Sequence, residues 1–216
     1  MPYQGFRFAA PLPVFFPALR ASLLLRFHFN FSGIIRNFAD DKRRTNRIRM
    51  AEVSLRKWES SDKESLMALC NAVDRRYLSD RLPSPYRMTD AEAWLKMVED
   101  AEGREGVYRA IVTDNRIVGS ISVERKADVF RVDGEIGYML LTDYWSRGIT
   151  TMAVGLIVDT AFSLLGLRRI SGLVYKENVA SAKALTRNGF VLEGTLRQAA
   201  LKDDCIHDLL LYALVR

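Results

Sequence analysis

Two loop-to-helix junctions, about thirty residues apart, constrain the fold of this chain more than any other feature. The first covers residues 144–151 and reads YWSRGITT, and the second covers residues 174–181 and reads VYKENVAS. In the first, small residues lead into a helix, so backbone N–H groups face outward. The first turn of a helix has unpaired donors at the positive end of its dipole, which is typical of an anion-binding loop. In the second, Asn178 and Ser181 lie three residues apart at a strand-to-helix junction, where both side chains can face one ligand.

The charge of the chain is concentrated near its beginning. The net charge is +6, from 32 Lys and Arg and 26 Asp and Glu. Residues 1–49 hold nine of the basic and two of the acidic residues, so residues 50–216 carry 23 basic and 24 acidic residues, a net of −1. A nearly neutral body argues against a nucleic-acid groove in the globular part, and we expect no nucleic-acid partner.

Residues 1–49 differ from the remainder in composition. They hold eight of the eleven Phe and four of the six Pro, and they contain no Asp or Glu before Asp40. Arg20 and Arg26 interrupt the apolar stretches, so no run approaches the roughly 18 residues that span a bilayer, and we expect no stable membrane insertion. Three interpretations stay open: a targeting segment, sequence upstream of a native start at Met50, and a tail that is poorly ordered or touches a membrane surface. We expect a non-domain extension over residues 1–49 and one domain over residues 50–216.

Cysteine and histidine are too few for a disulfide framework or a zinc site. The chain has two cysteines, Cys70 and Cys205, and two histidines, His28 and His207, without the spacing of a metal motif. We therefore expect a reduced, cytoplasmic protein without a metal.

Hydrophobic periodicity predicts a single α/β domain. We expect strands over residues 53–58, 107–112, 117–123, 134–141, 169–175, 190–196 and 206–215. Helices are predicted over residues 65–73, from Thr89 to about Val98, and over residues 151–165 and 179–187. The helix over residues 151–165 is apolar almost all round, which predicts burial, and Gly166 is its expected stop. Gly119 is a candidate β-bulge.

Taken together, the two junctions resemble the acyl-CoA site of the GNAT superfamily of N-acetyltransferases. Residues 188–199, NGFVLEGTLRQA, followed by His207-Asp208 and Tyr212-Ala213, look like the bacterial ribosomal-protein serine/alanine N-acetyltransferase branch. The resemblance covers nearly all of residues 52–216. It implies a mixed, mostly antiparallel sheet flanked by about four helices, with acetyl-CoA as the co-substrate.

The resemblance also implies a set of cofactor-binding residues. The family phosphate motif, Gln/Arg-x-x-Gly-x-Gly/Ala, falls on Trp145 to Thr150, where the central Gly148 fits and both end positions depart from the pattern. Backbone N–H groups are then expected to hold the CoA pyrophosphate at Ser146, Arg147, Gly148, Ile149, Thr150 and Thr151. The backbone of Met139, Leu140 and Leu141 is expected to bind the pantetheine arm as an added strand would.

The following helix offers further cofactor contacts. Asn178 is expected to cap this helix, and the resemblance adds a contact between its amide and the CoA chain. Lys183 and Arg187 lie four residues apart, and they either contact the adenosine phosphate or form a solvated face.

Amine acetylation needs a neutral amine, a donor for the tetrahedral oxygen and a proton for the departing thiolate. Many relatives use a Tyr as the acid, but Leu185 occupies that position here. In the ribosomal-protein branch the Ser of the Asn-x-x-Ser pattern takes this role, which falls on Ser181. The alternative for Ser181 is a helix first-turn residue that satisfies the backbone.

The general base is less directly indicated. Related enzymes carry a Glu at a position that is Ala200 here. We assign the role to Glu135, on the strand that flanks the acetyl site, with a surface carboxylate as the alternative. Asp208 and His207 are outside candidates for the base, and Tyr138 and Tyr212 are candidate lining residues.

The function that these features favour is an acetyl-CoA-dependent N-acetyltransferase acting on a primary amine, with a protein N-terminus as the first choice. Two alternatives stay open: a polyamine- or antibiotic-modifying acetyltransferase, and a non-catalytic module that binds CoA. We expect a monomer or a homodimer.

The composition of residues 1–49 generates a first prediction. A protein that begins at Met50 should keep the melting temperature and the acetyltransferase activity of the full chain, because the domain is expected to start there. Thermal denaturation and a thiol-release assay on both forms check this. A large loss in either measurement would mean that the Phe-rich segment packs on the domain.

Overall fold

A seven-stranded sheet organises the chain. The computed structural model describes residues 52–216, so the predictions on residues 1–49 and on Met50 lie outside the described part. The strand order is β1-β2-β3-β4-β5-β7-β6, and every neighbouring pair is antiparallel except β4 and β5. The strands are β1 (Ser54–Arg56), β2 (Gly106–Thr113), β3 (Arg116–Arg125), β4 (Asp133–Leu140), β5 (Arg169–Tyr175), β6 (Val191–Lys202) and β7 (Cys205–Val215).

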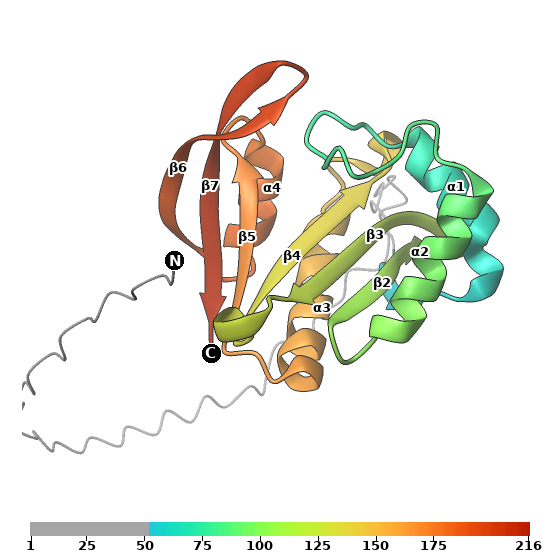
Figure 1. Ribbon diagram of the computed structural model, residues 1–216, viewed down its shortest axis with the longest axis horizontal. Helices are drawn as coiled ribbons and strands as arrows, with labels where there is room; N and C mark the ends of the chain where they lie inside the picture. The colour runs from blue at the N-terminus through green and yellow to red at the C-terminus, as the bar shows by residue number, and fades with distance from the viewer. Residues whose placement is uncertain (1–51) are drawn as a thin grey trace, which may run out of the picture. The chain divides into compact units, whose positions relative to one another are not determined.

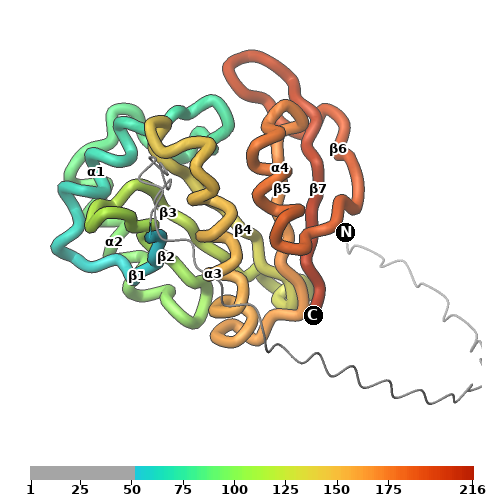
Figure 2. Tube along the Cα trace, turned by 180° about the vertical axis from the view of Figure 1, so that it is seen from behind, coloured from blue at the N-terminus to red at the C-terminus, as the bar shows by residue number. Residues whose placement is uncertain are grey.

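Helices cover both faces of the sheet (Figures 1 and 2). The α-helices are α1 (Lys63–Ala72), α2 (Met88–Ala101), α3 (Ile149–Leu165) and α4 (Val179–Thr186), and short 3-10 turns lie at Ser60–Asp62, Asp128–Phe130 and Thr142–Tyr144. Helices α1 and α2 form one apolar cluster with Tyr108 and Ala110 of β2. Helices α3 and α4 form the other cluster with Val107 and Ile111, whose side chains point to the opposite face. The predicted α/β class and the mixed, mostly antiparallel sheet flanked by four helices are confirmed. In the part of the chain that the structure describes, no helix is long and apolar enough to cross a membrane.

The bulge predicted at Gly119 is present. Ile111 pairs with Gly119 but Val112 pairs with Ile117, so one extra residue is accommodated on β3. A Cβ atom on Gly119 would lie 2.5 Å from the carbonyl oxygen of Met139 on β4. The position therefore tolerates only glycine without a shift of the neighbouring strand.

Helix α3 differs from its prediction in one respect. It ends at Gly166, whose left-handed φ of 59° terminates the helix as expected. The predicted burial holds for one side of the helix only, because seven of its residues are buried while Leu156 is 49% exposed and Leu164 is 50% exposed. The helix rests on one face of the sheet, so only the side chains on its inner side can reach the core.

Strands β4 and β5 pair over only three residues. The parallel register joins Asp133 to Arg169, Gly134 to Ile170 and Glu135 to Ser171, and β4 continues to Leu140 without this partner. Figure 1 shows the two strands diverging from this point. The sheet thus opens between its two halves.

A polar cluster fixes the point of divergence. Asp133 accepts hydrogen bonds from Lys126 at 2.8 Å and from the hydroxyl of Ser171 at 3.1 Å. Lys126 also donates to the Ser171 hydroxyl at 2.9 Å, and Ser171 is 1% exposed. Arg169 lies 3.4 Å from Asp133 and forms a two-pronged pair with Glu193 of β6. Charged groups at low exposure strengthen each other when they are paired, so this cluster resists further separation of the strands.

Candidate functional site

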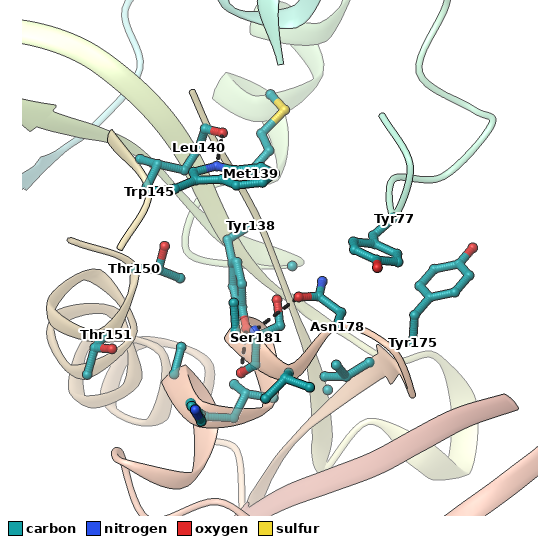
Figure 3. A pocket seen from close by; sticks show the side chains of 18 of the residues that line it. Tyr77, Tyr138, Met139, Leu140, Trp145, Thr150, Thr151, Tyr175, Asn178 and Ser181 are labelled. Carbon is teal, nitrogen blue, oxygen red and sulfur yellow. Dashed lines mark hydrogen bonds between the residues drawn. The ribbon is translucent and has the colours of Figure 1, made fainter. Parts of the chain in front are cut away.

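A cavity of about 840 Å³ occupies the opening between β4 and β5. Its lining comes from the two diverging strands, from the loop before α3 and the first turn of that helix, from the segment around α4, and from Asp74 and residues 76–78 between α1 and α2. Figure 3 shows Thr150 and Thr151 of α3 on one side, and Asn178 and Ser181 of α4 facing them across Tyr138. The two junctions singled out in the sequence therefore meet at one cavity.

The loop before α3 and the first turn of that helix, residues 146–151, have the backbone geometry of an anion-binding site, which we call the anion cradle. Ser146 and Gly148 have positive φ angles of 60° and 78°, and the helix starts at Ile149. The first backbone hydrogen bond of α3 runs from the N–H of Met152 to the carbonyl of Gly148 at 3.1 Å. The N–H groups of the three residues before Met152 thus precede the hydrogen-bonded ladder and are free to bind an anion.

The six loop residues named for pyrophosphate do not all face the cavity. Ser146, Gly148, Ile149, Thr150 and Thr151 line it. The guanidinium of Arg147 instead lies 5.2 Å from the centre of the Tyr144 ring. Any contribution of Arg147 to the cradle would therefore come from its backbone.

Beyond the point of divergence, the backbone N–H and C=O groups of β4 point alternately toward β3 and toward the cavity. The N–H of Leu141 donates to Val118 of β3 at 2.9 Å. The carbonyl of Leu140 accepts a bond of 2.9 Å from the indole N–H of Trp145. Successive residues of an antiparallel strand direct their N–H and C=O groups to opposite edges, so Tyr138 and Leu140 share the edge that faces the cavity. Met139 and Leu140 line the cavity, whereas Leu141 does not.

The first turn of α4 is capped by Asn178. Its side-chain oxygen accepts a hydrogen bond of 3.2 Å from the backbone N–H of Ser181, so this cap does not use the serine hydroxyl. The Tyr138 hydroxyl donates to the carbonyl of Ser181 at 3.4 Å. Burial raises the pKa of Tyr138 to about 12, with the Ser181 contact as a smaller opposing effect. Tyr138 is therefore a protonated donor at neutral pH, and it links β4 to α4 across the opening.

Charge is distributed unevenly around the cavity. Lys183 and Arg187 of α4 contribute basic groups to the lining, on the helix that faces the first turn of α3. Glu135 of β4 and Glu177, which precedes α4, contribute carboxylates. The carboxylate of Glu177 lies 3.6 Å from Nδ1 of His207.

Glu135 has an unusual neighbour in the sheet. It lies directly opposite Glu124 of β3, and both side chains are exposed. Like charges in directly opposed positions destabilise a sheet. The opposed carboxylates therefore do not stabilise the pairing of β3 with β4.

An aromatic wall closes one side of the cavity, and sequence reasoning missed it. The Tyr77 ring lies 5.4 Å from the Tyr175 ring, and both residues line the cavity. The His207 ring, which does not line the cavity, lies 5.3 Å from the Tyr175 ring. Figure 3 shows Tyr77 and Tyr175 side by side near Asn178. An ion pair between Asp80 and Lys202 joins the same α1–α2 segment to the β6–β7 hairpin. These residues are far apart in the sequence and follow no common spacing, so no local pattern indicates the wall.

The remaining candidates lie outside the cavity or serve other contacts. Tyr212 is packed in the core on the α3 side and does not line the cavity. Asp208 accepts hydrogen bonds from the backbone of Gln198 at 3.0 Å and from Lys176 at 3.1 Å, and these bonds lower its pKa. Leu185, where many relatives carry the acidic Tyr, is 1% exposed, packs in the core and also lines the cavity. Ala200 lies on β6, opposite His207.

Comparison with known proteins identifies a family for most of the domain. The acetyltransferase (GNAT) domain matches residues 52–191. An uncharacterised N-acetyltransferase, YoaA of Bacillus subtilis, is 33% identical over 100 residues, which are 46% of this chain and 56% of that protein. The ribosomal-protein-serine acetyltransferase of Escherichia coli is 32% identical over 103 residues, which are 48% of this chain and 57% of that protein. The chain thus spans somewhat more than half the length of these two relatives.

A solved structure shares the fold. It is RimL, a ribosomal L7/L12 alpha-N-protein acetyltransferase in complex with coenzyme A, with a TM-score of 0.65 and 20% identity. The match covers 76% of this chain and 93% of that one. At this identity the likeness establishes the fold alone.

The geometry of Gly148 generates a second prediction. Replacing Gly148 with Val should weaken CoA binding by about tenfold or more, because the residue needs a positive φ and its Cβ would enter the open space in front of the cradle. Titration calorimetry with CoA measures the effect.

Gly103 provides a matched control for this substitution. It also has a positive φ, of 75°, with nothing within 4 Å of a built Cβ, and it does not line the cavity. Gly103→Val should therefore bear a similar backbone strain and keep its affinity for CoA. Equal affinities of Gly148→Val and the parent protein would place the cradle elsewhere.

Proposed function

Because this chain belongs to the acetyltransferase (GNAT) domain family, we propose that it transfers the acetyl group of acetyl-CoA to a primary amine, and that the amine is a protein N-terminus. The observation that carries the proposal is the cavity at the divergence of β4 and β5. It brings an anion cradle, an open strand edge and a capped helix start to one place. A cofactor with a pyrophosphate at one end and an extended amide chain at the other matches this set of groups.

The charges support an anionic donor and a cationic acceptor. Lys183 and Arg187 lie on the helix that faces the cradle and complement the phosphates of CoA. Glu135 and Glu177 complement an ammonium group, which is the form that an amine takes in water at neutral pH. The aromatic wall beside Glu177 adds ring faces that attract a cation.

The reaction requires three proton transfers. Glu135 accepts a proton from the ammonium form of the amine, directly or through water, and the neutral nitrogen attacks the thioester carbonyl. The nitrogen of the tetrahedral intermediate then loses a second proton to solvent. The intermediate collapses, the carbon–sulfur bond breaks, and Ser181 gives a proton to the thiolate and regains one from solvent. An α-amine has a pKa near 8 and a thiol one near 8.5, so each transfer needs only modest assistance near neutral pH.

Support for a protein N-terminus comes from the relatives. One is named a ribosomal-protein-serine acetyltransferase, and the solved structure is named an alpha-N-protein acetyltransferase. Acidic residues near a polyamine site would form a dense cluster, whereas one of the three lining carboxylates here, Asp74, is already paired with Arg76 at 2.6 Å.

A thiol-release assay with acetyl-CoA and a panel of amines tests the function. The panel contains peptides with a free N-terminus, their blocked counterparts, polyamines and aminoglycosides. Release with free peptides but not with blocked ones is the expected result. Preference for a small amine would mean that the acceptor is not a protein N-terminus. Binding of CoA without thiol release in the presence of any amine would indicate a non-catalytic module.

The proposed acid generates a third prediction. Ser181→Ala should lower kcat by about 10²–10⁴-fold with little change in CoA affinity, since positioned acid–base groups are worth this much. The helix cap should survive the change, because Asn178 bonds to the backbone N–H of Ser181 and not to its hydroxyl. Steady-state kinetics and calorimetry measure the two effects. A normal turnover number would return Ser181 to a structural role and leave water as the acid.

The proposed base generates a fourth prediction, on pH dependence. At pH 6.5 only about 3% of an α-amine of pKa near 8 is neutral, so removing the base should lower the turnover rate most at this pH. Glu135→Gln should therefore lower turnover strongly at low pH and recover part of it as the pH rises toward 9. Rates from pH 6 to 9 measure the profile.

Glu124→Gln is the matched control, because Glu124 lies opposite Glu135 but does not line the cavity. It should keep the pH profile of the parent protein. A loss in Glu135→Gln that is constant across pH would mean that Glu135 positions the acceptor. No loss would remove it from the reaction.

A further inference from the structure

One side-chain amide joins the two helices whose first turns line the cavity. Asn188 follows the end of α4, and its Nδ2 donates to the carbonyl of Thr151 at 2.9 Å and to the carbonyl of Ala184 at 2.8 Å. Thr151 lies in the first turn of α3, and Ala184 lies within α4. Both hydrogens of a single amide are thus used, one on each helix. Within residues 52–216 this is the only hydrogen bond between α3 and the α4 segment.

The backbone on either side of Asn188 is held in place. Gly189 has a φ of 83°, and its N–H donates to Thr186 at 3.1 Å, which ends α4 in a left-handed turn. Phe190 donates its N–H to Leu185 at 3.2 Å and is only 3% exposed in the core. The direction of the Asn188 side chain is therefore set by a helix stop and by a buried anchor.

Helix α3 has a gap that admits the amide. Gly155 lies one turn after Thr151, and a Cβ atom on it would approach the side-chain oxygen of Asn188 to 2.9 Å. Glycine is unfavourable in the interior of a helix relative to alanine, so its presence here requires a reason in the packing. Contact with Asn188 is such a reason, because any larger residue would push the amide away from α3.

We propose that Asn188 is a positioning residue for acetyl-CoA, which it does not itself contact. It fixes the distance between the anion cradle at the start of α3 and the Asn178–Ser181 turn at the start of α4. One CoA molecule must reach both places, so its affinity depends on their separation. This inference rests on the proposed function, because it needs CoA to be bound at the cradle.

Two variants test the contact from its two sides. Asn188→Asp keeps the shape of the side chain, removes both donors and sets an oxygen against two carbonyls. Gly155→Ala displaces the amide while it favours the helix. Each variant should raise the CoA dissociation constant and the KM for acetyl-CoA by about three- to tenfold, which corresponds to weakening about one hydrogen bond between CoA and the displaced helix starts. Turnover at saturating acetyl-CoA should change by less than about twofold, since the reacting groups stay in place.

Thermal denaturation separates positioning from stability. Gly155→Ala should keep or raise the melting temperature while it weakens CoA binding, a combination that a purely structural role does not produce. Thr186→Ala is the control, because its hydroxyl bonds only to Lys183 within α4, at 3.3 Å, and it does not line the cavity. It should keep the parent affinity for CoA.

The outcomes are distinguishable from a failure of the proposed function. If the parent protein does not bind CoA in calorimetry, both proposals fall. If the parent binds CoA and Gly155→Ala binds it equally well, the positioning role of Asn188 is refuted and the proposed function stands. If Asn188→Asp does not fold, Gly155→Ala alone decides the question.

Discussion

The three-residue contact between β4 and β5 is the constraint on which the remaining site geometry depends. A parallel pairing that continued along both strands would close the sheet and leave no cavity. The cluster of Lys126, Asp133 and Ser171 holds the strands together at the start of β4, where Asp133 and Ser171 are buried and Lys126 is partly buried. Beyond it, the edge of β4 is left without a strand partner, which is a rare arrangement in the middle of a sheet because unpaired backbone groups are costly. The indole of Trp145 satisfies one of them, at Leu140.

Two helix starts face this opening, and two side-chain hydrogen bonds set their position relative to β4 and to each other. Tyr138 links β4 to the first turn of α4, and Asn188 links the end of α4 to the first turn of α3. Both side chains donate hydrogen bonds to backbone carbonyls, so they fix the positions of whole helices and strands and not only of neighbouring side chains. The site is therefore supported by a frame that joins three elements, and a change in one of them would be transmitted to the other two.

Much of the fold follows from local sequence. The periodicity of residues 50–216 predicted all four α-helices and all seven strands, and the positive φ of Gly166 marks the helix stop expected there. The resemblance of two short junctions indicated the family, which the match over residues 52–191 confirms. Burial of α3 was overestimated, because apolar composition does not reveal that a helix rests against only one layer. The roles assigned to Ser181 and Glu135 stay predictions, since they depend on where an acetyl group and an amine lie.

The sequence by itself determined the elements and the two junctions, because helix starts, glycine turns and strand alternation are properties of neighbouring residues. Only the tertiary structure decided what surrounds the cavity. Tyr77 and Tyr175 meet there from the α1–α2 segment and β5, with His207 of β7 packed against Tyr175, and Asn188 reaches Thr151 across 37 positions of the chain. Such contacts depend on the order of strands in the sheet and on the packing of helices against it. Neither leaves a periodic signal in the residues themselves, so the enclosure of the site follows from the packing and not from any local motif.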